Sequence, residues 1–481
     1  MTKRTTRVQA QQQQSDMPHL VKSAAKPDVS NLGSCVLDAQ NAALDSDAGP
    51  ADPTDFQDLR SRLDKCRDKL PPLYRDAVFD PYVGSLDKLG QQGFVKILLQ
   101  DPLRERAAGL MLDIAHAILQ NGEGYQQRAT DGFQEVVSDL FDGFLSAEDR
   151  KAVSPPDQGT IPPLVKWGAP DAGPYTWPVD ATKAFGVRAP IVNLPPANAR
   201  HGILAWVALA HETGGHDILN ADTGLLQELA DQVFQALHNA NLSPVIPDYW
   251  AERIDETASD VLGMLNMGPA AGIGLVGYFR GLNAAFVGTA SLRNDGPDQD
   301  PHPADILRGF LAASCVRRLK FGGASAWAKV IEDETRKDVK DIELASVSVS
   351  EDQAKKSADI VAEVIAEVIM RAKLKSLENH ALGYIQNWRD SDEKIVRQLR
   401  GLLTQAGQLP TTVESGTYAA HVVAAAATAA VSHNANIPLL FDRTLGILKR
   451  MHDANASWGP LFVAHPGQIA AHATYIVHAG A

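Results

Sequence analysis

The stretch AHETGGHD, residues 210–217, places a glutamate directly after one histidine and a second histidine five residues beyond the first. Imidazole nitrogens and carboxylate oxygens are the usual protein ligands of zinc, and a catalytic zinc takes three protein ligands and keeps one position open. His211 and His216 can supply two of these ligands. The stretch therefore predicts a metal site on a helix, with the third ligand elsewhere in the chain.

The spacing of the two histidines is too long for a regular helix. Residues i and i+5 point roughly 140° apart around a helix, against about 40° for i and i+4. A bulge of one residue would bring both imidazoles to one ion, and such bulges concentrate at functional sites. Gly214 and Gly215 lower the steric cost of the distortion. We therefore expect an irregular helix between Glu212 and His216; the alternative is a helix end, with Asp217 starting a loop.

A second segment, ERIDETASDVLGML at residues 252–265, supplies the candidate third ligand. Glu256 and Asp260 are four residues apart, so both lie on one face of a helix. Glu256 is placed to bind the metal, and Asp260 to hydrogen-bond a ligand histidine and fix the orientation of its ring. Glu212 points elsewhere on its helix, where its carboxylate can act as a general base on the attacking water.

A third segment, DPHPADILRG at residues 300–309, begins another apolar helix. His302 and Arg308 are six residues apart in it. An imidazole and a guanidinium near the open metal position can stabilise the oxyanion of a tetrahedral intermediate. These two residues are therefore candidates for contacts with the substrate.

The ordered segments HE…H, ExxxD and HPxxxxR resemble the gluzincin metallopeptidases, especially the HtpX and CAAX-prenyl-protease-like group, over about residues 185–315. That group has two residues between the glutamate and the second histidine, where this chain has three, and is usually membrane-bound; the HETGGH spacing is similar instead to HExxGH of dipeptidyl peptidase III, a soluble zinc peptidase. The resemblance implies a zincin-like core that cleaves peptides or proteins. It also implies roles for the matching residues: zinc ligands His211, His216 and Glu256, general base Glu212, and substrate or oxyanion contacts His302 and Arg308.

Composition limits the class of partner and the compartment. The net charge of −13 argues against nucleic acid as a partner, because phosphate binding needs a basic surface. The apolar run at residues 261–279 contains several glycines and a proline, which favours buried helix and loop over stable membrane insertion. Three separated cysteines (Cys35, Cys66 and Cys315) form no disulfide framework and predict a reducing, cytoplasmic location.

The pattern along the chain predicts a mainly α protein of the α+β class, with a small β-sheet just before the HETGGH motif. Proline-flanked runs at 150–200 suggest short strands at a sheet edge. The expected parts are a disordered or loosely attached tail (1–55), an N-terminal helical region (56–150), a zincin-like metal-binding catalytic core (151–320) and a C-terminal helical region (321–481). Nothing in the sequence predicts the oligomeric state.

Other functions and other residues remain open at this stage. The long helical flanks also suit a catalytically inactive interaction or scaffold protein that retains the metal site, and the same ligands suit an iron or manganese oxidase. Tyr249 and Trp250 fit a core or a lid better than a catalytic role. His421 and His433 fit structural histidines, and Cys315 fits the core.

Overall fold

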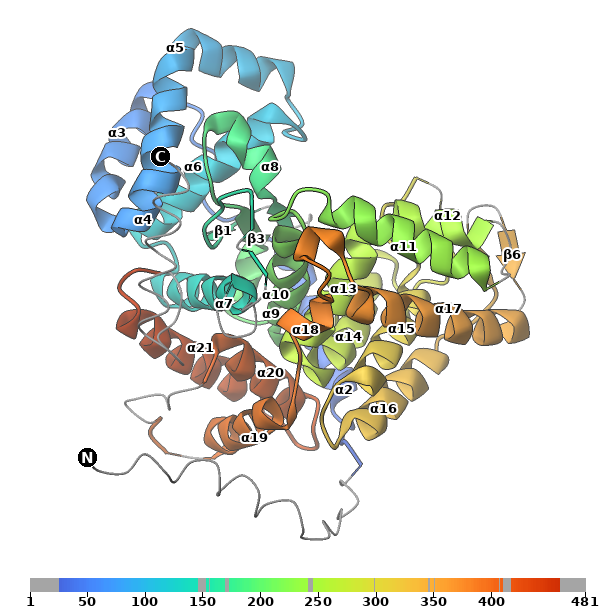
Figure 1. Cartoon of the computed structure of the whole chain (residues 1–481). Helices are drawn as coiled ribbons and strands as arrows, with labels where there is room; N and C mark the ends of the chain where they lie inside the picture. Colours follow the sequence, from blue (N-terminus) through green and yellow to red (C-terminus); the bar gives the residue numbers. More distant parts are fainter. Residues whose placement is uncertain are drawn as a thin grey trace, which may run out of the picture.

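The computed structural model is mainly helical, with small sheets, as the sequence predicted (Figure 1). Within the described residues, each helix is too short or too polar to cross a membrane. The run at 261–279 is divided between two helices by Gly268, whose φ is 57°. The structure describes residues 26–145, 153–154, 156–168, 173–240, 245–297, 299–344, 347–349, 351–405, 407–409 and 417–458.

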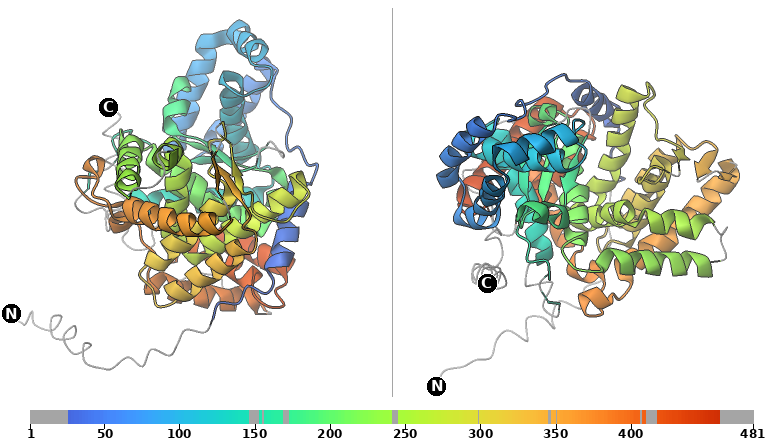
Figure 2. Two further views of the ribbon diagram at one scale, coloured as in Figure 1. Left: turned by 90° about the vertical axis from the view of Figure 1, so that its right-hand side faces the viewer. Right: turned by 90° about the horizontal axis from the view of Figure 1, so that it is seen from above.

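The first group of helices has a hydrophobic core of its own, built around Tyr82, Phe94 and Met111. Figure 1 shows this group at the top, and the left view of Figure 2 shows how far it projects from the remainder. The longest helix of this group, α5 (Asp80–Gln100), turns at Gly90, where φ is 59°. The group consists of α3 (Phe56–Cys66), α4 (Pro72–Tyr74), a π-helical turn (Arg75–Phe79), α5 (Asp80–Gln100), α6 (Ala107–Glu123) and α8 (Val179–Thr182).

The remaining helices share one larger core. Its centre contains tilted aromatic rings in contact, with Trp167 lying 5.0 Å from Phe133 and 6.3 Å from Trp206 between ring centroids. Such rings bury large apolar areas and dominate core energetics. The helices are α7 (Gln127–Leu145), α9 (Ile203–Val207), α10 (Leu209–His211), α11 (Leu225–Asn239), α12 (Val245–Glu252), α13 (Ile254–Met267), α14 (Pro269–Phe286), α15 (Asp305–Arg318), α16 (Ala324–Arg336), α17 (Glu351–Arg371), α18 (Leu382–Ile385), α19 (Asp390–Thr404), α20 (Ala419–Ala430) and α21 (Ile437–Ala454).

A three-stranded sheet precedes the HETGGH motif, in the order β1-β3-β2. Strand β1 (Leu164–Trp167) runs parallel to β3 (Ile191–Leu194), and β2 (Tyr175–Trp177) is antiparallel to β3. The proline-flanked run that we expected at an edge is the central strand β3. The flanking prolines at 190 and 195 lie just outside it, so no hydrogen bond of the ladder is lost.

A second sheet was not expected from the sequence. It joins β4 (Asp295–Gly296), β5 (Ile342–Leu344) and β6 (Val347–Val349), with β4 parallel to β5 and β5 antiparallel to β6. Strands of two or three residues lack the alternation that identifies longer ones, which explains the omission.

The predicted tail of residues 1–55 is wrong for its second half. Helix α2 (Leu32–Ala43) packs on α14, and its Cys35 and Ala39 are fully buried in the larger core. Gly281 of α14 allows this contact, because a Cβ at that position would lie only 2.6 Å from the Cβ of Ala39. Residues 1–25 lie outside the described residues.

The described residues of the predicted C-terminal region, 321–481, belong to the larger core and form none of their own. Helix α17 packs on α15, and α20 packs on α9, so the C-terminal helices complete the core that carries the HETGGH motif. Figure 1 accordingly shows α10 and α13 at the centre, between α7 and α20 on one side and α15 and α17 on the other.

Candidate metal centre

The HETGGH motif forms a π-helical turn, Glu212–Asp217, directly after α10. A π-helical turn has its hydrogen bonds between residues five apart, so it brings side chains at i and i+5 to the same side. The prediction of an irregular helix between Glu212 and His216 is confirmed. The alternative of a helix end is wrong, because the chain continues in helical conformation through Ile218 and Leu219.

The two glycines in this turn serve close packing. A Cβ at Gly215 would lie 2.4 Å from the Cβ of Ser259, and one at Gly214 would lie 2.8 Å from the amide nitrogen of Asn266. Both neighbours belong to α13. The glycines thus let the π-helical turn approach α13 closely, which is the helix that carries Glu256. From the sequence, the two glycines were expected to ease the backbone distortion alone.

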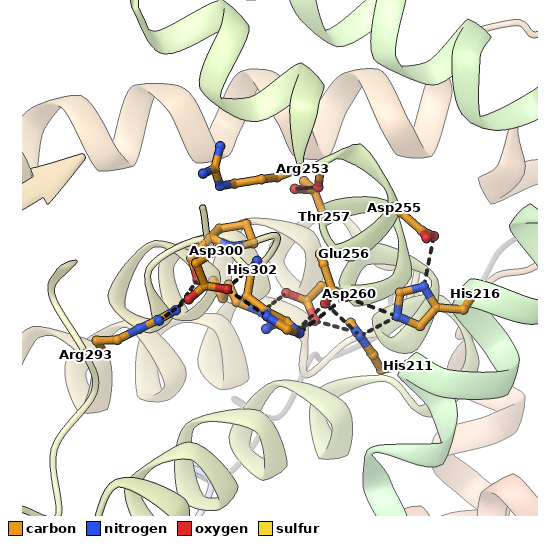
Figure 3. A network of polar contacts seen from close by, with 12 residues as sticks. His211, His216, Arg253, Asp255, Glu256, Thr257, Asp260, Arg293, Asp300 and His302 are labelled. Atoms are coloured by element: carbon orange, nitrogen blue, oxygen red, sulfur yellow. Dashed lines mark hydrogen bonds and ion pairs between the residues drawn. The ribbon is translucent and has the colours of Figure 1, made fainter. Parts of the chain in front are cut away.

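His211, His216 and Glu256 converge on one point (Figure 3). The Nε2 atoms of the two histidines are 3.1 Å apart. Glu256 places Oε2 3.2 Å from Nε2 of His211 and Oε1 3.5 Å from Nε2 of His216. A tetrahedral zinc ion with bonds of about 2.0–2.1 Å separates its ligand atoms by roughly 3.3 Å. The three side chains therefore already have the spacing of zinc ligands.

A carboxylate contacts the Nδ1 atom of each imidazole, on the side of the ring away from the cluster, and so orients the ring. The Nδ1 atom of His211 lies 2.9 Å from Oδ1 of Asp260, and the Nδ1 atom of His216 lies 2.8 Å from Oδ1 of Asp255. Donation from Nδ1–H to the carboxylate leaves Nε2 of each ring as the atom that faces the cluster, and carboxylates behind metal-binding histidines commonly have this role. Asp260 was predicted in this role from the sequence, and Asp255 was not. Its signal was the adjacent acid pair at 255–256.

Glu256 has the features of a metal ligand, because its contacts in the protein are with the candidate ligand histidines, His302 and Arg308. Its Oε2 atom is buried and has no hydrogen bond of regular geometry, although Nε2 of His211 lies 3.2 Å away. Burial raises the pKa of Glu256, but the close contact and charge of His211 and the charge of Arg308 outweigh this and hold its pKa well below the usual range. An ionised, buried carboxylate oxygen with no hydrogen bond fits a divalent cation at this point.

The same carboxylates act on the histidines. Burial lowers the pKa of His211, while Asp260 and Glu256 raise it, and the net result is a pKa of about 10. The cluster therefore favours positive charge at its centre. A divalent ion would supply that charge in place of the proton, and its binding would release the proton to water.

Glu212 lies beside the cluster and is free to react. Its side chain lines the same cavity as the three candidate ligands, the residue is only 7% exposed, and its carboxylate accepts no hydrogen bond from the described residues. Burial raises the pKa of Glu212, although the nearby histidines oppose this. A raised carboxyl pKa and a position next to the ligands suit a general base.

His302 reaches the cluster, as expected from the sequence. Its Nε2 atom is 3.4 Å from Oε1 of Glu256, and its Nδ1 atom is 2.9 Å from Oδ1 of Asp300. Asp300 is held in turn by Arg293, and Figure 3 shows this chain of contacts leading to Glu256. The His302 side chain is half exposed, so it can meet a bound molecule.

Arg308 differs from the expectation of a free cation at the oxyanion position. Its guanidinium is buried and binds both carboxylate oxygens of Asp260, at 2.7 and 2.9 Å. Its nearest approach to Glu256 is 3.6 Å, at Oε2. Arg308 therefore acts on the cluster through Asp260, as a positioning residue, because a two-point ion pair fixes the carboxylate that orients His211.

The remaining candidate residues have structural surroundings. Tyr249 accepts a hydrogen bond from the backbone N–H of Ala304 through its hydroxyl, and Trp250 is buried beside it, so both fit the predicted core role. Cys315 is fully buried. His421 is buried and lies 2.9 Å from Asp392, as a structural histidine should. His433 is exposed, which differs from the prediction.

A cavity of about 430 Å³ opens beside the metal cluster. Strand β2, the edge strand of the first sheet, borders it through Tyr175 and Thr176. Thr176 donates a hydrogen bond of 2.7 Å to Asp217, on the π-helical turn. Tyr175 and Trp177 point the other way and both donate to Asp113 of α6. The strand is therefore fixed in position relative to the cluster.

Compared with protein families, curated protein sequences and solved structures, the chain gives no match. Within the described residues, His211, His216 and Glu256 form the one group of three with the spacing of metal ligands. What this cluster does is therefore inferred from its own geometry.

Proposed function

We propose that this protein is a zinc-dependent peptidase of the gluzincin type, with a zincin-like core. The observation that carries the proposal is the convergence of two Nε2 atoms and one carboxylate, at 3.1, 3.2 and 3.5 Å, beside the unpaired carboxylate of Glu212. Three protein ligands with a neighbouring acid are the pattern of a hydrolytic zinc site, where the fourth position stays open. The free, buried thiols of Cys35, Cys66 and Cys315 support action in a reducing compartment such as the cytoplasm.

Each residue of the site has a defined part in this chemistry. His211, His216 and Glu256 would hold the zinc ion, which lowers the pKa of water and polarises a carbonyl oxygen. Glu212 takes the proton of the attacking water and passes it to the leaving amine. His302, half exposed and next to Glu256, is placed to donate a hydrogen bond to the oxyanion. Asp255, Asp260 and Arg308 hold the ligands in place.

The edge strand supports a peptide as the substrate. Strand β2 is the edge strand of its sheet, pairs with β3 on one side and lines the cavity through Tyr175 and Thr176. An extended peptide can pair with such an edge through its backbone, which presents a peptide bond independently of most of its side chains. Because Thr176 and Asp217 connect β2 to the π-helical turn, the bound peptide and the metal ligands share one rigid frame.

The buried Glu212 also favours an enzyme over an inactive scaffold that merely retains the metal site. Its carboxylate faces the cavity without a hydrogen bond from the described residues, an arrangement that serves proton transfer and has no use in a scaffold. An iron or manganese oxidase would use the same three ligands, since two histidines and one carboxylate also bind those ions. The identity of the metal separates that alternative from the peptidase.

Metal analysis is the first test. Protein purified without chelators should contain about one zinc per chain, and His216→Ala should lose it, because a chelate of three ligands becomes one of two. The control is His433→Ala, an exposed histidine far along the chain, which should keep its zinc. Protein free of metal would contradict the proposal, and stoichiometric iron or manganese would favour the oxidase.

Peptide cleavage is the second test. Glu212→Gln should retain zinc yet lose peptidase activity by a factor of roughly 10²–10⁴, the usual contribution of a general base. Mass spectrometry of a mixed peptide library before and after incubation measures the activity. Zinc-loaded wild-type protein that cleaves nothing in the library would leave the scaffold as the better description.

A further inference from the structure

One wall of the cavity beside the metal cluster is apolar. It consists of one face of α14, where the lining residues recur at three- and four-residue steps, and of two residues of α9. The metal cluster and Glu212 line the same cavity. The residues of the apolar wall are Ala271, Gly274, Leu275, Tyr278, Phe279 and Leu282 of α14, with Leu204 and Val207 of α9.

Large side chains on this wall are left partly uncovered by the protein. Leu275, Phe279 and Leu282 are each only partly buried, although they line a cavity. Apolar surface in contact with water costs roughly 25 cal/mol per Å² relative to burial. An apolar group of matching size would therefore gain free energy by covering these three side chains.

The wall has a fixed shape because its two helices touch at glycines. A Cβ at Gly274 would lie 2.9 Å from Cγ1 of Val207, and one at Gly277 would lie 2.6 Å from Cδ1 of Leu204. Helices in such close contact leave little room for rearrangement. A fixed apolar surface discriminates between ligands by size as well as by polarity.

Charge on a ligand would find no compensation at this wall. Arg308 is the one lysine or arginine among the described residues that line the cavity, and both oxygens of Asp260 already pair with it. Its guanidinium covers the ring of Phe279 at 4.6 Å. A charged side chain laid against α14 would lose its water at a wall that has no charged residue of its own, which is costly, and the carboxylates that line the same cavity would also repel an anionic one.

Tyr278 adds one polar group to the wall. The residue is buried, and its hydroxyl makes no hydrogen bond to the described residues. A buried tyrosine hydroxyl usually has a partner. A carbonyl oxygen of a peptide backbone, which runs beside each of its side chains, would supply that partner.

We propose that this wall is a side-chain subsite, and that the substrate is a peptide with a large uncharged apolar residue, such as leucine or phenylalanine, next to the bond that is cleaved. The inference rests on the proposed peptidase activity. It goes further by naming the class of substrate and the residues that select it.

Guest peptides test the selectivity. Host peptides of glycine and serine, each with a single leucine, phenylalanine, alanine, aspartate or lysine, are incubated with the zinc-loaded protein, and mass spectrometry locates the cleaved bond. We expect cleavage beside leucine or phenylalanine, with kcat/KM roughly tenfold or more above that for alanine and lowest for the charged guests. Equal rates for all five guests would overturn the subsite and leave the peptidase intact.

A variant assigns the selectivity to the wall. Leu275→Ala should lower the ratio of kcat/KM for the leucine and alanine guests by roughly tenfold, since the guest loses apolar contact. This ratio does not depend on how much of the protein is active, so partial unfolding cannot imitate the effect. The matched control is Leu439→Ala on α21, a leucine 43% exposed, which should leave the ratio unchanged. An unchanged ratio in Leu275→Ala would contradict the assignment.

Binding separates this inference from the proposed activity. The same peptides are titrated into zinc-loaded Glu212→Gln protein, in which turnover is not needed. If no peptide is cleaved by the wild type but the leucine and phenylalanine guests bind with a preference of roughly tenfold over alanine, the subsite stands and the peptidase proposal fails. Binding without any preference overturns the subsite.

Discussion

Two groups of buried carboxylates in this protein have opposite electrostatic surroundings. At the metal cluster, burial raises the pKa of Glu256 and Asp260, but the histidines and Arg308 outweigh this and lower both pKa values. On α7, burial raises the pKa of Asp139 to about 8 against the backbone hydrogen bonds of Ala419 and Ala420, and no cation among the described residues opposes it. Glu135 and Asp142, on the same helix, also have pKa values well above the usual range because of burial.

The difference lies in the neighbours, because all these side chains are buried. On α7 the least costly state is the protonated acid, which carries no charge to desolvate. At the metal cluster, a guanidinium and two imidazoles keep the acids ionised. Paired buried charges add little stability overall and often less than apolar side chains would, so their presence suggests a functional reason. Holding a cation is such a reason.

The largest expected effect comes from removing the guanidinium of Arg308, which pairs with the acids of the metal cluster. Arg308→Met leaves Asp260 and Glu256 buried without their guanidinium, and in metal-free protein this should lower the free energy of unfolding by about 3–5 kcal/mol. Urea unfolding in the presence of a chelator measures the loss.

The control for this variant is an exposed ion pair. Arg128 pairs with Asp442 at 2.6 Å, with side chains 48% and 63% exposed, so Arg128→Met should cost no more than about 1 kcal/mol. If Arg308→Met lowers the free energy of unfolding no more than Arg128→Met does, the buried acids do not depend on the Arg308 guanidinium, and the contrast with α7 is lost.

A smaller effect is expected from the carboxylates that orient the histidines. Asp260→Asn should weaken zinc binding by about 10–100-fold, because an amide no longer fixes the imidazole of His211 as a carboxylate does. Competition with a chromophoric chelator measures the affinity. The matched variant Asp255→Asn acts on His216, but its carboxylate is 47% exposed, so water can replace the hydrogen bond and the loss should be smaller. Equal zinc affinity in wild type and Asp260→Asn would refute the orienting role.

Much of this site follows from local sequence patterns. A helix repeats every 3.6 residues, so Glu256 and Asp260 had to share a face, and the five-residue step between the histidines required an irregular turn. Asp255 was missed because it lies about 100° from Glu256 around α13, and only the bent path of the π-helical turn brings His216 to it. The role of Arg308 depends on a long-range pairing with Asp260 that no spacing reveals.

The fold likewise has parts that local sequence patterns predict and parts that depend on long-range packing. Long amphipathic segments such as α7 and α17 are visible as a periodic pattern, and the mainly helical class followed from them. Helix α2 was not predicted, because polar residues surround it in the sequence and its apolar face is recognised only once α14 covers it. The second sheet depends on pairing between residues about 50 positions apart, which is a property of the packed chain.

The last prediction concerns α7 and tests the other half of the comparison. With a folded pKa of about 8 against an ordinary 3.8, Asp139 keeps its proton in the folded state where the unfolded chain has lost it. Between pH 3.8 and about 8 the folded state therefore binds more protons than the unfolded chain. The contribution of Asp139 to the free energy of unfolding is fully present below pH 3.8 and falls as pH rises to about 8, by up to about 1.4 kcal/mol per pH unit.

Asp139→Asn should remove that contribution while keeping the acceptor for the backbone N–H of Ala420. Urea unfolding from pH 5 to 8 should show the variant gaining stability relative to wild type as pH rises, with a residual slope from Glu135 and Asp142. Asp442→Asn, at an exposed position on α21, serves as the control and should run parallel to wild type. A variant that loses stability relative to wild type toward pH 8 would mean that Asp139 is ionised and paired, and the two groups of carboxylates would then be alike.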